Sequence, residues 1–197
     1  MALTLTTELE AVNMMLETIG EQPVNTLTVS GLADVAMAKQ RLKVESRKVQ
    51  ASGWDFNTDI KFRLVRDTNN QIPRPTDALR IDVVGSSVDI VERGSFLYNR
   101  DTNSFTFTED YDFDIVRFLN FEDLPEAARF YIAVRASRVF QRRVLGDDAI
   151  EAFTQDEEFE ARILLEDADS ETADRSLLND PVTAHLARAN RSRELRW

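Results

Sequence analysis

The sequence has no cysteine and a single histidine, His185. Without cysteine there are no disulfides, thiol nucleophiles or cysteine zinc sites. Catalytic triads and two-histidine metal sites need a histidine beside other reactive groups, whereas His185 lies in a polar stretch near the end of the chain. The six glycines are scattered, and neither common glycine-rich phosphate-binding pattern occurs. We therefore expect no cofactor, no metal and no enzymatic activity.

Long apolar runs and an excess of positive charge are missing as well. No apolar run approaches the ~20 residues that cross a bilayer, and the first residues show no basic segment followed by an apolar one. This pattern predicts a soluble protein made in the cytoplasm. The 35 acidic residues outnumber the 24 basic ones, and the net charge of −11 does not favour binding to nucleic acid phosphates.

Hydrophobic periodicity predicts two helices at the start of the chain. Thr7 and Glu10 form a capping-box pattern that opens the first helix, and Gly20 ends it. The second helix is expected over residues 32–51, where apolar residues fall on two sides, as in a helix between two neighbours. Trp54 and Phe56 follow, and these aromatic side chains are expected to close the core where the helices meet the next region.

Between residues 57 and 119 the apolar period changes to two, which predicts a small antiparallel sheet of five or six strands. Ile60, Phe62 and Leu64 mark the first strand and are expected to face the core. Residues 92–95 separate two short apolar runs and predict a hairpin turn.

Helical periodicity returns near residue 124. Proline at the first helical position opens the third helix at Leu124-Pro125, and Gly146 ends it. The expected core face of this helix consists of Ala128, Ile132, Ala136, Val139 and Phe140. The arginines beside that face are Arg135, Arg138 and Arg142.

The fourth helix starts at Asp147 or Asp148, and its periodicity fades after about Ser170. Its predicted core stripe consists of Ile150, Phe153, Ala161, Leu164 and Ala168. Phe159 and Ile163 lie roughly opposite this stripe. From residue 147 to residue 174 there are twelve acids and one base, which gives a local charge of −11.

These elements predict an α+β fold that is mainly helical. We expect a four-helix bundle formed by residues 1–56 and 120–175, with a small antiparallel β-sheet inserted over residues 57–119. Residues 176–197 are expected to form an extended C-terminal tail.

Several short strings, in this order and spacing, resemble the tail tubular protein A family of T7-like short-tailed bacteriophages. The strings are Glu8–Asn13 with Ile19–Leu27, Ser52–Asn57, Leu124–Glu126 with Arg129–Ile132 and Arg135–Phe140, and Gln155–Glu158 with Glu160–Ala161. The resemblance spans roughly residues 8–168 and is carried by the helical segments. Between residues 61 and 112 only the β character matches.

The resemblance implies a structural role in the virion tail. Members of the family form a twelve-fold ring between the portal and the nozzle, which is made by tail tubular protein B. Tail fibres attach near the lower junction, and genomic DNA passes through the ring without specific binding. The family fold is a helical bundle with an inserted β region. A virion protein of this kind is present in the host cytoplasm during assembly.

Two sets of residues are therefore predicted to mediate contacts. The predicted subunit interface consists of Arg135, Arg138, Arg142, Phe159 and Ile163. Residues 181–197 carry a net charge of +3 and lack an apolar stripe, so they are expected to order on binding the portal. The residues predicted to bind the portal are Arg188, Arg191, Arg193, Arg196 and Trp197.

Other interpretations of the acidic and basic segments stay open. The acidic fourth helix fits a solvated face, a lining of the DNA conduit, or a partner for arginines of a neighbouring subunit. Carboxylate pairs fit a polysaccharide-degrading tail protein, in which two carboxyls about 5 to 9 Å apart carry the reaction. The arginine-rich tail, with Trp197 as a stacking aromatic, fits a nucleic-acid-binding module.

Overall fold

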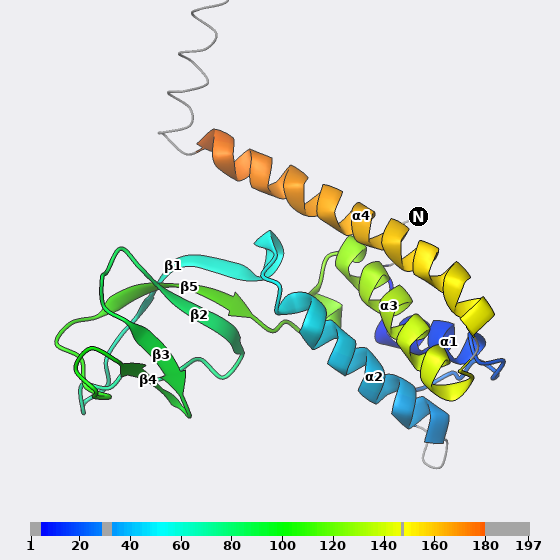
Figure 1. The fold of residues 1–197 in the computed structure, drawn as a ribbon, viewed down its shortest axis with the longest axis horizontal. Helices are drawn as coiled ribbons and strands as arrows, with labels where there is room; N and C mark the ends of the chain where they lie inside the picture. Colours follow the sequence, from blue (N-terminus) through cyan, green and yellow to red (C-terminus); the bar gives the residue numbers. More distant parts are fainter. Residues whose placement is uncertain (1–4, 29–32, 147, 180–197) are drawn as a thin grey trace, which may run out of the picture.

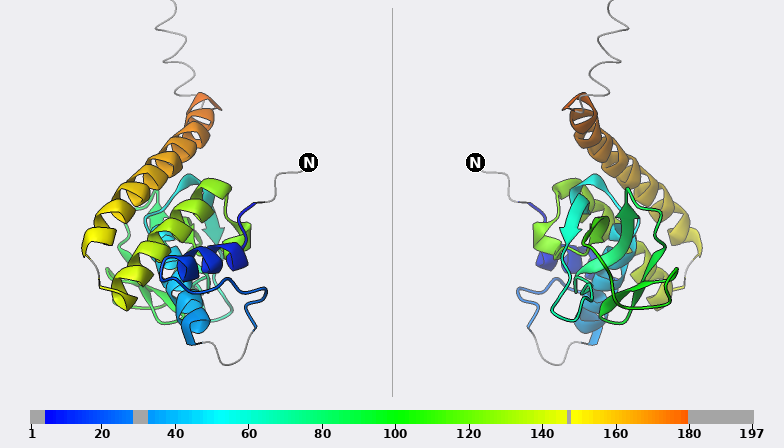
Figure 2. Two further views of the ribbon diagram at one scale, coloured as in Figure 1. Left: turned by 90° about the vertical axis from the view of Figure 1, so that its right-hand side faces the viewer. Right: turned by 90° about the vertical axis from the view of Figure 1, so that its left-hand side faces the viewer.

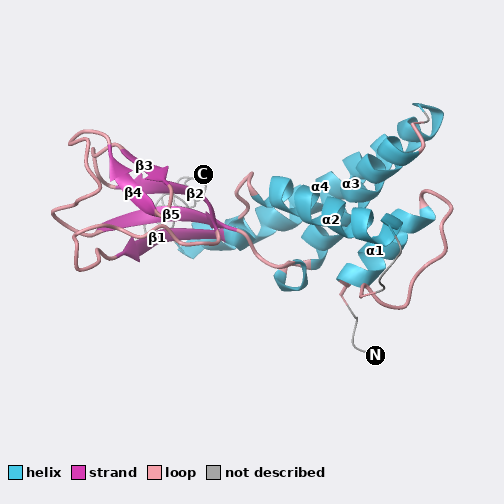
Figure 3. Ribbon diagram, turned by 90° about the horizontal axis from the view of Figure 1, so that it is seen from below, coloured by secondary structure: helices cyan, strands magenta, loops and turns pink. Residues whose placement is uncertain are grey.

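The computed structural model describes residues 5–28, 33–146 and 148–179, and its elements are labelled in Figure 1. In chain order they are α1 (Glu8–Glu17), α2 (Ala33–Gln50), the 3₁₀ turn η1 (Asp55–Asn57), β1 (Thr58–Leu64), β2 (Ala78–Val84), β3 (Ile90–Arg93), β4 (Phe96–Asn99), β5 (Tyr111–Arg117), the 3₁₀ turn η2 (Phe121–Asp123), α3 (Glu126–Val144) and α4 (Asp148–Asn179). Figure 3 shows the helices gathered at one end of the molecule and the strands at the other. The chain is α+β, as the sequence predicts.

Helix α3 organises the helical region. It packs against α1, α2 and α4, and it lies between α2 and α4 in Figure 1. Its buried side chains include Ala128, Ile132, Ala136 and Phe140, which the apolar periodicity assigns to the core. The finer prediction of a four-helix bundle is not confirmed, because α4 packs on α3 and its C-terminal end extends past the other helices (Figure 2).

The ends of α1 follow the predicted signals. Glu10 N donates to Thr7 Oγ1 at 3.2 Å and Thr7 N donates to Glu10 Oε2 at 2.8 Å, which is the capping box. Gly20 has φ +79°, and Glu21 N donates back to Leu16 O at 3.0 Å, so the helix ends where a left-handed residue is needed. Helix α4, in contrast, continues to Asn179, past the point where its apolar periodicity fades.

The strands form two small antiparallel sheets instead of the single predicted sheet. One has three strands in the order β1-β5-β2, and the other is the β3-β4 hairpin. The predicted turn of the hairpin is confirmed, with Gly94 at φ +64° between the two strands. A small core fills the β region, around Ile72, Leu97, Phe113 and Ile115.

The prediction that β1 turns its alternating apolar residues towards the core is wrong for two of the three. Leu64 is buried, whereas Ile60 is 63% exposed and Phe62 is 43% exposed. A β-bulge explains the exposure of Ile60: the register with β5 shifts between Asp59 and Phe62, and Lys61 has φ +55°. Phe62 and Leu64 both follow the bulge and lie on the same face of the sheet, so the bulge does not separate these two residues. A bulge breaks the period of two at Ile60. The strand β1 is also an edge strand of its sheet, and on the edge Phe62 has no neighbouring strand on one side to cover it.

A buried set of hydrogen bonds joins the two regions. Gln50 Nε2 donates to Leu119 O at 3.0 Å, and Leu119 N donates to Gln50 Oε1 at 2.7 Å. Asn57 Nδ2 donates to the carbonyl oxygens of Gln50 and Arg117 at 3.0 and 2.7 Å. Because these bonds hold both connections between the regions, we infer that the junction is a fixed corner.

Trp54 and Phe56 pack at this junction against the helical core, as predicted. Their rings are stacked, with centroids 6.5 Å apart, and Trp54 Nε1 donates to Val49 O at 2.7 Å. Gly53, just before them, has φ +80°, and an added Cβ would lie 2.7 Å from Arg80 Nη2. The turn from α2 into β1 therefore requires glycine at this position.

Candidate functional site

A chain of ion pairs crosses the helical region from α2 to α4. Arg135 of α3 lies at its centre, where Nε donates to Glu45 Oε2 of α2 at 3.1 Å and Nη1 donates to Glu158 Oε1 of α4 at 3.2 Å. Arg138 of α3 also donates to Glu158. Lys48 Nζ donates to Glu45 Oε1 at 2.8 Å. These pairs hold the three helices in one arrangement.

The Glu45 side chain is completely buried within this cluster. Burial on its own raises the pKa of the Glu45 carboxyl, but hydrogen bonds from Lys48 and Arg135, with their positive charges, outweigh it and lower the pKa below its ordinary value of 4.5. The carboxylate thus stays ionised and paired near neutral pH. It stabilises the fold and is not placed to act as a general acid.

Two of the three predicted interface arginines, Arg135 and Arg138, therefore bind acidic groups of their own chain. Arg142 is exposed on the last turn of α3. A contact of these arginines with a neighbouring subunit remains a prediction.

The outward side of α4 carries the other two predicted interface residues. Phe159 is 65% exposed, and Ile163, one turn further along, is exposed as well. With three acids around them they form what we call the acidic face. This face consists of the exposed residues Asp156, Phe159, Glu160, Ile163 and Asp167.

The core stripe of α4 differs from the predicted one. Ala161 is buried, but the next buried residue is Leu165, and both Leu164 and Ala168 are exposed. Two leucines in succession occupy positions 164 and 165, and the one a full turn from Ala161 takes the core position. The side chains of Ile150 and Phe153 lie outside the described residues.

The outward side of α2 has the opposite charge. The helix contains five bases and two acids, a net charge of +3, and one of those acids is the buried Glu45. Among the described residues, neither Lys39 nor Lys43 has an ion-pair partner. We call this side the basic face. It consists of Met37, Lys39, Gln40, Lys43, Val44 and Arg47, of which Val44 is half-buried and the others are exposed.

Sequence reasoning missed the basic face, although a signal was present. Three of the four lysines in the chain lie in α2, on a chain whose other bases are arginines.

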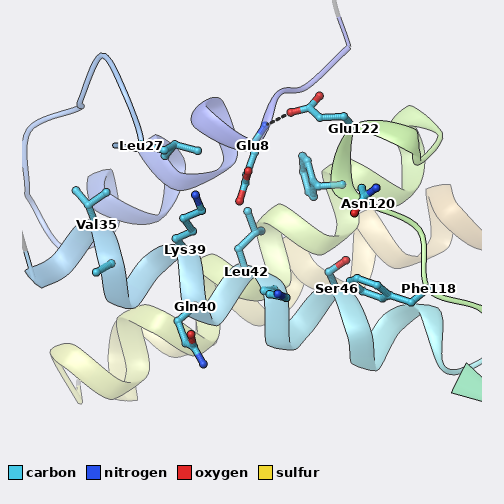
Figure 4. A pocket seen from close by; sticks show the side chains of 13 residues that line it. Glu8, Leu27, Val35, Lys39, Gln40, Leu42, Ser46, Phe118, Asn120 and Glu122 are labelled. Atoms are coloured by element: carbon cyan, nitrogen blue, oxygen red, sulfur yellow. Dashed lines mark hydrogen bonds between the residues drawn. The ribbon is translucent and has the colours of Figure 1, made fainter. Parts of the chain in front are cut away.

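A groove of ≈ 530 Å³ runs along one flank of the basic face (Figure 4). Lys39 and Lys43 line it from α2, and Glu8 and Glu122 line the opposite side. The Glu122 carboxylate is already engaged, because Glu8 N donates to it at 2.9 Å and Arg129 Nη1 at 3.3 Å. The Glu122 carboxylate is thus bound into the entry of α1, and the two acids do not form a free carboxylate pair.

The described residues hold no group of three or more metal-ligating side chains that could bind an ion. No described helix is both long enough and apolar enough to cross a membrane. The residues predicted to bind the portal, from Arg188 to Trp197, lie outside the described part of the chain.

The comparison with known proteins defines the class: the chain is a structural protein of a phage tail and not an enzyme. The family model for tail tubular proteins matches residues 9–175, so the chain belongs to the tail tubular protein family. It is similar to tail tubular protein A of Klebsiella phage KP34, with 28% identity over 165 residues that cover 81% of this chain and 86% of that protein. These matches favour neither the polysaccharide-degrading nor the nucleic-acid-binding alternative.

Proposed function

We propose that this chain is the adaptor of a short phage tail, a ring of about twelve copies between the portal and the nozzle. The single observation that carries the proposal is the family match, which spans almost all of the described helices and strands. The proposed partners are further copies of the chain, the portal, the nozzle protein (tail tubular protein B) and the tail fibre. Genomic DNA passes through the ring, and assembly takes place in the host cytoplasm.

A ring of identical subunits needs two different surfaces on each copy, which meet head to tail. The described chain offers such surfaces, because the basic and acidic faces lie on different helices. The predicted interface residues Phe159 and Ile163 belong to one of these faces. They fit contact with a neighbour, because fully burying such a side chain is worth about 1.5–3 kcal/mol.

In the same proposal, the C-terminal segment docks the portal. Residues 181–197 carry four arginines against one acid, and they end in a tryptophan, the kind of side chain that anchors protein interfaces. Arg188, Arg191, Arg193 and Arg196 would pair with carboxylates of the portal, and Trp197 would fill a pocket there.

Truncation after Asp180 tests this docking. We expect the truncated protein to keep its thermal unfolding midpoint and to bind the purified portal much more weakly, with salt weakening the intact complex. Glu194→Ala in the full-length chain is the matched control and should bind the portal at least as well as the wild type. Full-strength docking by the truncated protein would leave the segment without this role. A wild-type chain that binds neither portal nor nozzle would contradict the adaptor function itself.

A further inference from the structure

We propose that the acidic face of α4 in one copy packs against the basic face of α2 in the next copy. This inference rests on the proposed ring and adds which two surfaces form the contact between subunits.

Helix α4 exposes two large apolar side chains on its outward side. Phe159 is 65% exposed and Ile163 lies beside it on the next turn. Two large apolar side chains that lie together between acids gain nothing from contact with water, and a partner that covers them would remove this apolar surface from water. The described part of this chain leaves the pair exposed, so its surface is available to another molecule.

Charge identifies the partner surface. Asp156, Glu160 and Asp167 surround the apolar pair, and no described base forms an ion pair with them. On the basic face, Lys39 and Lys43 likewise have no carboxylate partner among the residues with described positions. Each face therefore carries the charge that the other lacks, and this complementarity favours their association.

The basic face also has apolar side chains and a depression that could receive the apolar pair of α4. Met37 is exposed and Val44 is half-buried on the basic face, so it too has apolar side chains between its charges. An open depression of ≈ 520 Å³, lined by Gln40, Lys43, Val44, Arg47, Lys48 and Ala51, crosses this face. The depression offers the aromatic ring of Phe159 a place with an apolar wall and a cationic rim.

The placement of the helices makes the contact intermolecular. Helix α2 turns Leu42 and Val49 inward and α4 turns Ala161 and Leu165 inward, and α3 lies between the two helices (Figure 1). The outer faces thus point away from each other and cannot meet within one chain. In a closed ring of about twelve copies, each subunit is rotated by about 30° relative to the next. The two contact surfaces of one subunit must therefore lie on nearly opposite sides, as the two faces do.

DNA is the other candidate for the basic face, since lysine and arginine also bind phosphates. The apolar side chains Met37 and Val44 on this face fit a protein partner better than a phosphate backbone. The existence of an oppositely charged face with its own exposed apolar pair favours a second copy of the chain.

Thiol cross-linking tests the pairing directly, because the natural chain has no cysteine. In the double variant Gln40→Cys/Ile163→Cys, a short bismaleimide should produce a ladder of covalent multimers in a denaturing gel. Each single-cysteine variant can give no product larger than a dimer, and Arg63→Cys/Ile163→Cys, with one thiol moved to β1, is the matched control. A double variant that stops at dimers would overturn the proposed pairing.

Charge reversal tests the same pairing of the two faces without depending on the length of a cross-linker. Lys43→Glu/Arg47→Glu should weaken self-association at least ~10-fold, measured by sedimentation, and so should Glu160→Lys/Asp167→Lys. A chain with all four changes should recover self-association, whereas Lys61→Glu on β1 should leave it unchanged. Recovery in the fourfold variant is the result that a merely misfolded chain would not give.

The outcomes separate this inference from the proposed function. Rings that form equally well with either pair of charges reversed would overturn the face pairing and leave the adaptor function intact. A loss of DNA affinity in Lys43→Glu/Arg47→Glu without a change in self-association would also overturn the pairing, in favour of DNA. A wild-type chain that stays monomeric, alone and on the portal, would instead contradict the proposed ring.

Discussion

The helical region and the β region of this chain are stabilised in different ways. Among the described residues, the helical core contains 18 buried apolar residues, from the four helices and from Leu124 just before α3, whereas the β core contains eight. Since stability scales with the apolar area removed from water, the β region has much less hydrophobic stabilisation of its own. It adds ion pairs at its periphery, such as those of Arg117 with Asp59 and Asp77.

The two cores remain separate clusters, and hydrogen bonds of Gln50, Asn57 and Leu119 form the corner between them. A hydrogen-bonded corner fixes direction, but it contributes little hydrophobic stabilisation. The difference suggests a division of roles: the helices carry the faces that we assign to subunit contacts, and the β region is an arm held at a set angle. The following predictions test how independent the two regions are.

The largest expected effect comes from emptying the β core. Phe113 is completely buried in β5, and Phe113→Ala should cost about 3–5 kcal/mol. Because that core is small and separate, hydrogen exchange should show lost protection in β5 and β2 while the amides of α3 stay protected. Leu165→Ala, at a fully buried site in the helical core, is the matched control and should spare the strands. Equal loss in both regions would mean that the corner makes the chain a single cooperative unit.

The next effect concerns the ion pairs that hold the helices together. Glu45→Gln should destabilise the protein by about 1.5–3 kcal/mol at pH 7, because Lys48 and Arg135 lose a buried charged acceptor. The folded-state pKa of Glu45 is lowered, so its contribution is full above the ordinary value of 4.5 and is lost as the pH falls through the folded value. The difference in the free energy of unfolding between the wild type and Glu45→Gln should therefore become smaller at acidic pH.

Chemical denaturation between pH 3 and pH 7 measures that difference. Glu166→Gln is the control, because Glu166 pairs with Arg162 on the exposed side of α4 and should change stability by less than about 0.5 kcal/mol. A Glu45 variant as stable as wild type at pH 7 would show that the cluster contributes only to the specificity of packing.

The two regions also differ in how far the sequence predicts them. In the helices, caps and a period of 3.6 residues locate α1 and the core face of α3, because local rules and burial agree there. In α4 the apolar periodicity is not sufficient, because it does not determine which of the adjacent residues Leu164 and Leu165 is buried. One of the two proposed contact surfaces is also predicted from the sequence. The exposure of Phe159 and Ile163 is expected from their position off the core stripe of α4.

What the sequence does not predict depends on tertiary packing. The partners of Arg135 come from helices far apart in the chain, so the ion-pair cluster has no local signature. The basic face of α2 becomes visible only when burial separates Glu45 from the exposed lysines. The exposure of Ile60 depends on the bulge in β1, and no residue type marks the position of a bulge uniquely.

The smallest expected effect tests the part of the β region where the sequence misleads. Phe62 lies 43% exposed on β1, and its ring receives the Arg117 guanidinium 5.0 Å from the centroid. Phe62→Ala should cost only about 0.5–1 kcal/mol, the value of an exposed cation–π contact. Leu64→Ala, two residues along the same strand and buried, should cost about 2–5 kcal/mol. Urea denaturation of both variants gives the comparison. If Phe62→Ala were as costly as Leu64→Ala, Phe62 would be a core residue of the β region and not a partly exposed residue of an edge strand.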